Sequence, residues 1–261
     1  MPFKARSALR PDAVLIGLLA ALVLLAWYAL WLWGRSPYGH LLLHGSPRHI
    51  HMTGQGPWVF AAVFVGGWTL MTVAMMLPTS FPLILLFHRM VRDRATAPWL
   101  VTLLVGGYLG VWLLCGLSLQ FVNWFLQAEI VRLSWPAAAP WISATVILTL
   151  AGLYQFSPLK YACLEKCRSP LMFITSRWQG GNEPVQTLRI GIEHGLFCVG
   201  CCWSLMLLMF IVGTGSLAWM LLLGAVMAVE KNLPWGRRLS APLGALLLLA
   251  AISVLVDGIR S

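Results

Sequence analysis

Long runs of apolar residues with almost no charge dominate this chain. The run from Ala13 to Trp33 contains no Asp, Glu, Lys or Arg, and about 20 apolar residues are enough to cross a bilayer core roughly 30 Å thick. Charged residues make up only 10% of the 261 residues, whereas a soluble domain carries about 25%. Because unpaired backbone groups are too costly in lipid, we predict an all-α fold, a polytopic transmembrane helical bundle.

Seven stretches are predicted to cross the membrane within one integral membrane domain, residues 1–261. They cover about 13–33, 59–77, 99–119, 140–156, 188–212, 217–229 and 241–256. The fourth and sixth are short, so either could be tilted, broken or re-entrant. The first follows basic residues, as a secretory signal does, but it is too long for one and lacks a small-residue cleavage site. It is therefore predicted to be retained as an anchor.

The positions of Lys and Arg predict the orientation, because short basic loops stay in the cytoplasm. With the N-terminus inside, only Arg35, Arg48, Arg132 and Arg260 of the 18 basic residues fall on the outer side. Adding or losing one helix would destroy this segregation. We therefore predict an N-in, C-out protein of the cell inner (plasma) membrane, surrounded by the lipid bilayer. The net charge of +10 does not indicate nucleic acid binding, because the basic residues lie between apolar runs.

Two loops of the predicted topology carry distinctive residues. In the cytoplasmic segment 157–187, Pro158 and the four-residue spacing of Cys163 and Cys167 predict a short interfacial helix. Residues 178–184 are typical of a turn-rich loop. The external loop 34–57 holds four histidines whose spacing matches no closed metal site, and their role stays open: His40, His44, His49 and His51.

The most specific chemical signal lies at the start of the fifth span, where Glu193 and His194 are followed by three cysteines. With His194 at zero on a helical wheel, Cys198, Cys201 and Cys202 fall at about +40°, −20° and +80°. These four side chains are therefore predicted to share one face in the cytoplasmic leaflet. Thiolate and imidazole are soft ligands that favour copper(I) and zinc. We predict a metal site for copper or zinc; the alternative is an incidental thiol cluster on an apolar packing face.

Two further sets of sulfur atoms could extend this site. Cys163 and Cys167 face the same predicted side as the first cluster, and packing against the bilayer is the alternative role. A disulfide between them is not expected, because the cytoplasm is reducing. Met75 and Met76 could add thioether ligands, although packing is the more common role of membrane methionines. They precede two prolines, at 78 and 82, which should break or kink the second span and free backbone carbonyls.

Two other residues have simpler expected roles. Cys115 lies far along the third span and is expected to be structural. Glu230, near the inner end of the sixth span, is expected to pair with Lys231 or with an arginine of the basic loop. Neither residue is part of the predicted metal site.

Three segments of the chain resemble the DUF2182 family, bacterial proteins described as predicted metal-binding integral membrane proteins. They are Met75-Met76-Leu77-Pro78, Ser157-Pro158-Leu159-Lys160-x-x-Cys163-x-x-x-Cys167-Arg168-Ser169-Pro170 and Gly191-x-x-His194-Gly195-x-x-Cys198-x-Gly200-Cys201-Cys202-Trp203. They occur in this order between about Val59 and Leu233. The resemblance implies a membrane location and metal binding, together with a small partner protein of another uncharacterised family.

Three functions are compatible with these features. The favoured one is metal handling, in which copper or zinc is bound and delivered to a small partner protein or within a homo-oligomer. The apolar outer half of the fifth span, from Leu205 to Val212, argues against a channel. The first alternative is a membrane subunit of a metal- or thiol-dependent oxidoreductase, which the spacing of Cys198 and Cys201 suggests. The second is a structural partner subunit without metal. Whether the protein is an enzyme is left open.

Overall fold

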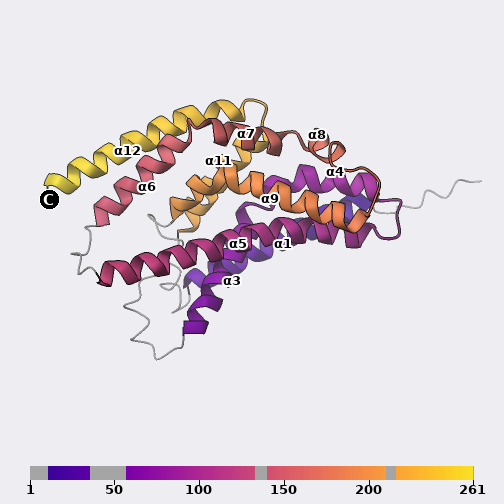
Figure 1. Ribbon diagram of the computed structural model, residues 1–261, viewed down its shortest axis with the longest axis horizontal. Helices are drawn as coiled ribbons and strands as arrows, with labels where there is room; N and C mark the ends of the chain where they lie inside the picture. The colour runs from indigo at the N-terminus through magenta and orange to yellow at the C-terminus, as the bar shows by residue number, and fades with distance from the viewer. Residues whose placement is uncertain (1–10, 36–56, 133–139, 210–215, 261) are drawn as a thin grey trace, which may run out of the picture.

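The protein is described by a computed structural model that covers residues 11–35, 57–132, 140–209 and 216–260. Every regular element in these ranges is a helix (Figure 1), which confirms the all-α prediction. The histidines of the predicted external loop lie outside the described residues. The elements in chain order are α1 (Pro11–Arg35), α3 (Pro57–Met75), η2 (Pro78–Ser80), α4 (Phe81–Val91), α5 (Ala97–Arg132), α6 (Pro140–Tyr154), α7 (Pro158–Arg168), α8 (Pro170–Thr175), α9 (Glu183–Leu207), α11 (Leu217–Asn232), η3 (Gly236–Leu239) and α12 (Ser240–Arg260).

Several of these helices are able to cross a membrane. By length and composition, four qualify in the described part of the chain: Asp12–Arg35, Ala97–Val122, Glu183–Leu207 and Gly236–Arg260. The number rises to six if each of two bent helix pairs forms one span. The predicted sixth span corresponds to α11, which has only 16 residues. Multiple membrane-spanning helices are therefore supported, while the count of seven and the sidedness stay predictions.

Contacts between neighbouring helices give their relative directions. α5 and α9 run parallel, since Leu104 lies against Gly191, and Val111, later in α5, lies against Gly195, later in α9. α6 and α12 run antiparallel, because Gly152 faces the start of α12 whereas the beginning of α6 faces its end. Figure 1 shows α6 and α12 side by side, extending together away from α1 and α4. In the predicted seven-span order, the third and fifth spans (α5 and α9) must run parallel, and the fourth and seventh spans (α6 and α12) must run antiparallel. The observed directions agree with that order.

The predicted break in the second span is confirmed. α3 ends at Met75, η2 begins at Pro78, and the axes of the two halves differ by 44°. Pro78 has no N–H to donate to the carbonyl of Ala74, and that carbonyl accepts a hydrogen bond from Trp27 Nε1 at 3.1 Å. The carbonyl of Met76 accepts from two hydroxyl groups. Side chains thus satisfy backbone groups that the helix break leaves free.

A second bend joins α6 to α7, whose axes differ by 64°. The Ser157 side chain caps α7 by accepting from the N–H of Leu159 at 3.2 Å, which explains why a helix starts at Pro158. The helix predicted here is confirmed; its interfacial position stays a prediction. α8 is an additional short helix that was not predicted. α9 begins at Glu183, before the predicted position 188, because Pro184 is tolerated in a first helical turn.

Candidate metal site

One face of α9 carries the predicted cluster into the protein interior. His194 is 3% exposed, Cys202 is 1% exposed, and Cys198 and Cys201 are fully buried. All four side chains are therefore buried in the interior, as residues on one inward face of α9 would be. Gly191 lets α9 approach α5 closely, because a Cβ atom there would overlap the carbonyl oxygen of Leu104.

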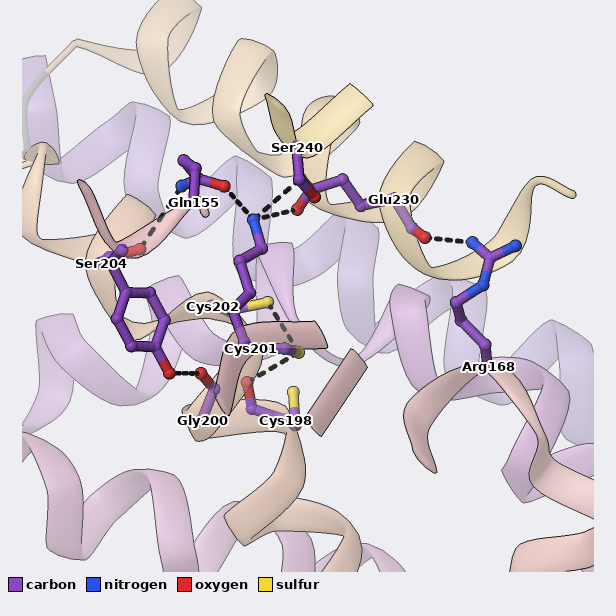
Figure 2. Close-up of polar contacts among 11 residues, drawn as sticks. Gln155, Arg168, Cys198, Gly200, Cys201, Cys202, Ser204, Glu230 and Ser240 are labelled. Atoms are coloured by element: carbon purple, nitrogen blue, oxygen red, sulfur yellow. Dashed lines mark hydrogen bonds and ion pairs between the residues drawn. The ribbon is translucent and has the colours of Figure 1, made fainter. Parts of the chain in front are cut away.

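Three sulfur atoms lie close together at the contact between α9 and α7. The Sγ of Cys201 is 3.4 Å from the Sγ of Cys202 and 3.9 Å from the Sγ of Cys167. Figure 2 shows the side chains of Cys201 and Cys202 beside Cys198 on α9. Two sulfurs that bind one ion at about 2.3 Å are at most about 4.6 Å apart. Both measured separations are therefore short enough for a shared ion.

The other cysteine of α7, Cys163, packs against α9 beside the cluster. A Cβ atom at Gly200 would lie 2.6 Å from the Sγ of Cys163, so the absence of a side chain at Gly200 lets α7 lie directly against α9. Cys163, like the other five cysteines, is a free thiol. The structure thus brings both cysteines of α7 to the α9 cluster, with Cys167 directed at its sulfur atoms.

Cys198 has two polar neighbours from other helices. Lys231 Nζ, at the end of α11, lies 2.9 Å from the Cys198 Sγ, and the Tyr108 hydroxyl of α5 lies 3.1 Å from it. Tyr108 also donates to the carbonyl of Met76 at 3.1 Å, and Lys231 donates to Thr79 Oγ1 at 3.1 Å. Cys198 is therefore linked by hydrogen bonds to the broken segment between α3 and α4.

His194 occupies a mostly apolar niche. Its ring lies 5.6 Å from the ring of Tyr108 and 5.7 Å from the ring of Phe173, measured between centroids. Its Nε2 is 3.2 Å from Ser80 Oγ. Its Nδ1 is buried and has no hydrogen-bond partner among the described residues. A buried nitrogen without a partner is costly, and it provides a free ligand position.

Three other predicted ligands make contacts outside the thiol cluster. Glu193 forms ion pairs with Arg177 and with Arg189, the latter at 2.8 Å. Met75 packs against Gly224 of α11. Met76 is fully buried, and its backbone carbonyl reaches the network around Cys198. Metal binding by Glu193, Met75 and Met76 stays a prediction.

A buried ion pair that the sequence did not indicate joins α7 to α11, one helical turn before Cys163. Lys160 Nζ is 2.8 Å and 3.0 Å from the two carboxylate oxygens of Glu230. Gln155 accepts from Lys160, and Ser240 donates to Glu230 at 2.7 Å (Figure 2). The expectation that the Glu230 carboxylate pairs with Lys231 or with an arginine of the basic loop is wrong, because α11 turns the two consecutive side chains toward different helices and the carboxylate pairs with Lys160.

A cavity of about 130 Å³ lies beside His194 and reaches the surface at exposed residues such as Pro82 and Asn232. Its buried wall contains Thr79, Ser80, His194 and Lys231, and Cys167 lines its other side. We call it the entrance pocket. Its lining consists of Thr79, Ser80, Pro82, Leu83, Cys167, Arg168, Pro170, His194, Lys231 and Asn232.

The donor chemistry of this region fits a soft metal ion, with clustered thiols, a free imidazole nitrogen and apolar surroundings. Within the part of the chain that the structure describes, no three His, Cys, Asp or Glu residues already form a group able to hold a metal ion. Ligation by a third group would therefore require side-chain rotation. No sequence signal indicated that Ser80, Tyr108 and Lys231 would be polar partners of this site. They become recognisable only through their contacts with His194 and Cys198.

The fold and this site define a class: all-helical proteins with several helices able to span a membrane and a buried cluster of thiols beside a histidine. The family model described as PpoB2, copper chaperone, matches residues 65–254. The chain therefore belongs to this family. No curated protein and no solved structure shows a significant match to the chain. The matched region contains every described residue of the candidate site.

Proposed function

We propose that this protein is a membrane-embedded copper carrier that holds copper(I) at the interface of α9 and α7 and delivers it to a partner protein. The observation that carries the proposal is the grouping of three sulfur atoms, in which the buried Cys201 lies within 3.9 Å of both the buried Cys202 and the half-buried Cys167. Membership of a copper chaperone family supports copper, rather than zinc, as the cargo.

The proposed ligand set follows from which donors are free. Cys201, Cys202 and Cys167 supply thiolates, which are preferred ligands of copper(I). Cys198 joins them after side-chain rotation, and the free Nδ1 of His194 supplies a further donor. Glu193 is left out of this set because its carboxylate is already held by two arginines.

Delivery, rather than conduction across the membrane, is favoured by the composition of α9 and its surroundings. Beyond Cys202, the helix continues with Ser204 as its one small polar side chain and otherwise with apolar or aromatic residues. The entrance pocket instead opens beside Cys167 and Arg168. Copper would therefore enter and leave on the same side, which the distribution of basic residues predicts to be cytoplasmic.

Metal analysis of the purified full-length protein tests this proposal. After reduction and loading with copper(I) in detergent, we expect wild type to retain roughly one copper per chain, bound through sulfur ligands. The triple variant Cys198→Ser/Cys201→Ser/Cys202→Ser should retain almost none. Cys115→Ser is the matched control, because Cys115 is a half-buried thiol on α5, and it should bind copper like wild type.

The same samples separate this function from its alternatives. Equal copper retention in wild type and the triple variant would refute the proposed site. A reversible change in the optical or paramagnetic spectrum on adding dithionite would instead support a redox subunit, since copper(I) in a carrier is already reduced. Zinc retained under the same conditions at a higher stoichiometry than copper would contradict the choice of cargo.

A further inference from the structure

The entrance pocket has a distinctive charge. Its only charged lining residues are basic, Arg168 and Lys231, and none of its lining residues is Asp or Glu. The nearest buried carboxylate, Glu230, is turned away from it and held by Lys160 and Ser240. A bare cation that enters this pocket meets like charge in a partly dry environment, whereas an anion meets two opposite charges.

The pocket is also large enough for a thiol group. A water molecule needs at least about 10–15 Å³ of such space, so the cavity of about 130 Å³ accommodates the CH₂–S end of a cysteine together with its metal ion. Its lining places Cys167 and His194 in reach of that ion. The Sγ of Cys201, the central thiol of the cluster, lies 3.9 Å from the Sγ of Cys167.

We propose that the entrance pocket receives copper(I) as an anionic complex with two thiolates of a carrier, and that Lys231 and Arg168 attract this complex. The proposal rests on the copper-carrier function and specifies the form in which the cargo arrives. Copper(I) bound to two thiolates carries one negative charge, which is the sign that the pocket favours. The carrier is either a small cytoplasmic thiol or a cysteine pair of a protein, since both present the same chemistry.

Transfer then proceeds by stepwise ligand exchange. Cys167 forms a bond to copper as the first carrier thiolate leaves, and Cys201 replaces the second. Each incoming protein thiol gives its proton to the thiolate that departs, so two carrier thiols are released for two protein thiols consumed. Copper remains copper(I), and the product is again an anionic bis-thiolate complex, now on Cys167 and Cys201, with Cys167 lining the same pocket as Lys231.

Loading rates from three copper donors test the proposal on the full-length protein in detergent. The donors are copper(I)–glutathione, copper(I) on a synthetic Cys-x-x-Cys peptide, and the copper(I)–acetonitrile cation. For Lys231→Gln we expect loading from at least one bis-thiolate donor to slow by about tenfold or more, the scale of electrostatic steering. Loading from the acetonitrile cation, which carries no negative charge, should slow less than loading from that bis-thiolate donor. Lys231→Arg, which keeps the charge, should restore the rate.

Arg92→Gln is the charge-matched control. Arg92 is exposed and lies at the opposite end of α4 from the pocket residue Pro82, so its loss should not alter any rate. Slowing confined to glutathione identifies a small thiol as the source, and slowing confined to the peptide identifies a protein. Equal slowing with all three donors, or no slowing with any of them, would refute the proposal that the entrance pocket receives an anionic copper(I)–thiolate complex. The copper-carrier function would remain intact. No copper uptake by wild type from any donor would refute both.

Discussion

Lys160 and Glu230 form a salt bridge in which the ammonium lies 2.8 Å from one carboxylate oxygen, and neither side chain is more than 1% exposed. The pair joins α7, which carries Cys163 and Cys167, to α11, which carries Lys231. Removing one partner leaves a buried charge without compensation, which costs about 3–5 kcal/mol. We expect Lys160→Met and Glu230→Leu each to lower the stability of the protein in detergent by about this amount.

The double variant Lys160→Met/Glu230→Leu is the informative comparison. With both charges gone, most of the stability should return, since apolar replacements of buried pairs are often neutral. Denaturation midpoints of the wild type, both single variants and the double variant measure this coupling. Additive losses in the double variant would show that the two side chains contribute independently.

The contact between α7 and α9 at Gly200 gives a second prediction. A Cβ atom at this position would lie 2.6 Å from the Cys163 Sγ, so Gly200→Ala should destabilise the protein by about 1–3 kcal/mol through overpacking. It should also reduce copper retention by moving Cys167 away from Cys201. Cys163→Ala in the same chain should relieve both effects. Gly106→Ala is the matched control, because nothing lies within 4 Å of the added atom.

The two cysteines of α7 are expected to differ in function. Cys167 lies 3.9 Å from the Cys201 Sγ and lines the entrance pocket, whereas Cys163 packs against the backbone at Gly200. Cys167→Ser should therefore weaken copper binding and slow loading. Cys163→Ser should act mainly on stability. Competition against a chromogenic copper(I) chelator measures both affinities, and equal losses in the two variants would contradict the distinction.

The Tyr108 hydroxyl connects Cys198 to the helix break, since it is 3.1 Å from both the Cys198 Sγ and the carbonyl oxygen of Met76. Tyr108→Phe removes this buried hydroxyl and should cost about 0.5–1.5 kcal/mol, with faster copper release to a chelator. Tyr28→Phe, at an exposed position on α1, is the control. An unchanged release rate in Tyr108→Phe would show that the hydroxyl has no influence on the site.

The predicted orientation can be tested at the loop before α9. Gly180 is exposed and adopts a positive φ of 76°, which is typical of a turn that tolerates insertion. A reporter inserted here should report a cytoplasmic location, and one at the C-terminus an external location. The reverse result would overturn the N-in, C-out topology and the reducing environment expected for the thiols.

Much of the α9 cluster could be predicted because helical periodicity depends only on sequence spacing. The spacing of His194, Cys198, Cys201 and Cys202 puts them on one face of any helix, and an apolar chain buries that face. The break at Pro78 was predictable for an equally local reason, the missing N–H of proline. The sequence could not indicate which groups would meet the freed carbonyls, because Trp27 and Tyr108 come from other helices.

The basic residues show where such reasoning ends. Counting charges placed Lys160 and Lys231 on the cytoplasmic side of the membrane, but it did not indicate that both side chains are buried. Glu230 and Lys231 are neighbours in the chain, but consecutive helical residues point about 100° apart, so one reaches α7 and the other reaches α9.

By itself, the sequence therefore determined the helices, the break and the inward face of thiols, since each follows from local geometry and apolar composition. Only the tertiary structure decided that Cys167 meets Cys201, that Glu193 turns to arginines and that Lys231 faces Cys198. These contacts depend on how separate helices pack against one another, and residue spacing within one helix does not predict that packing.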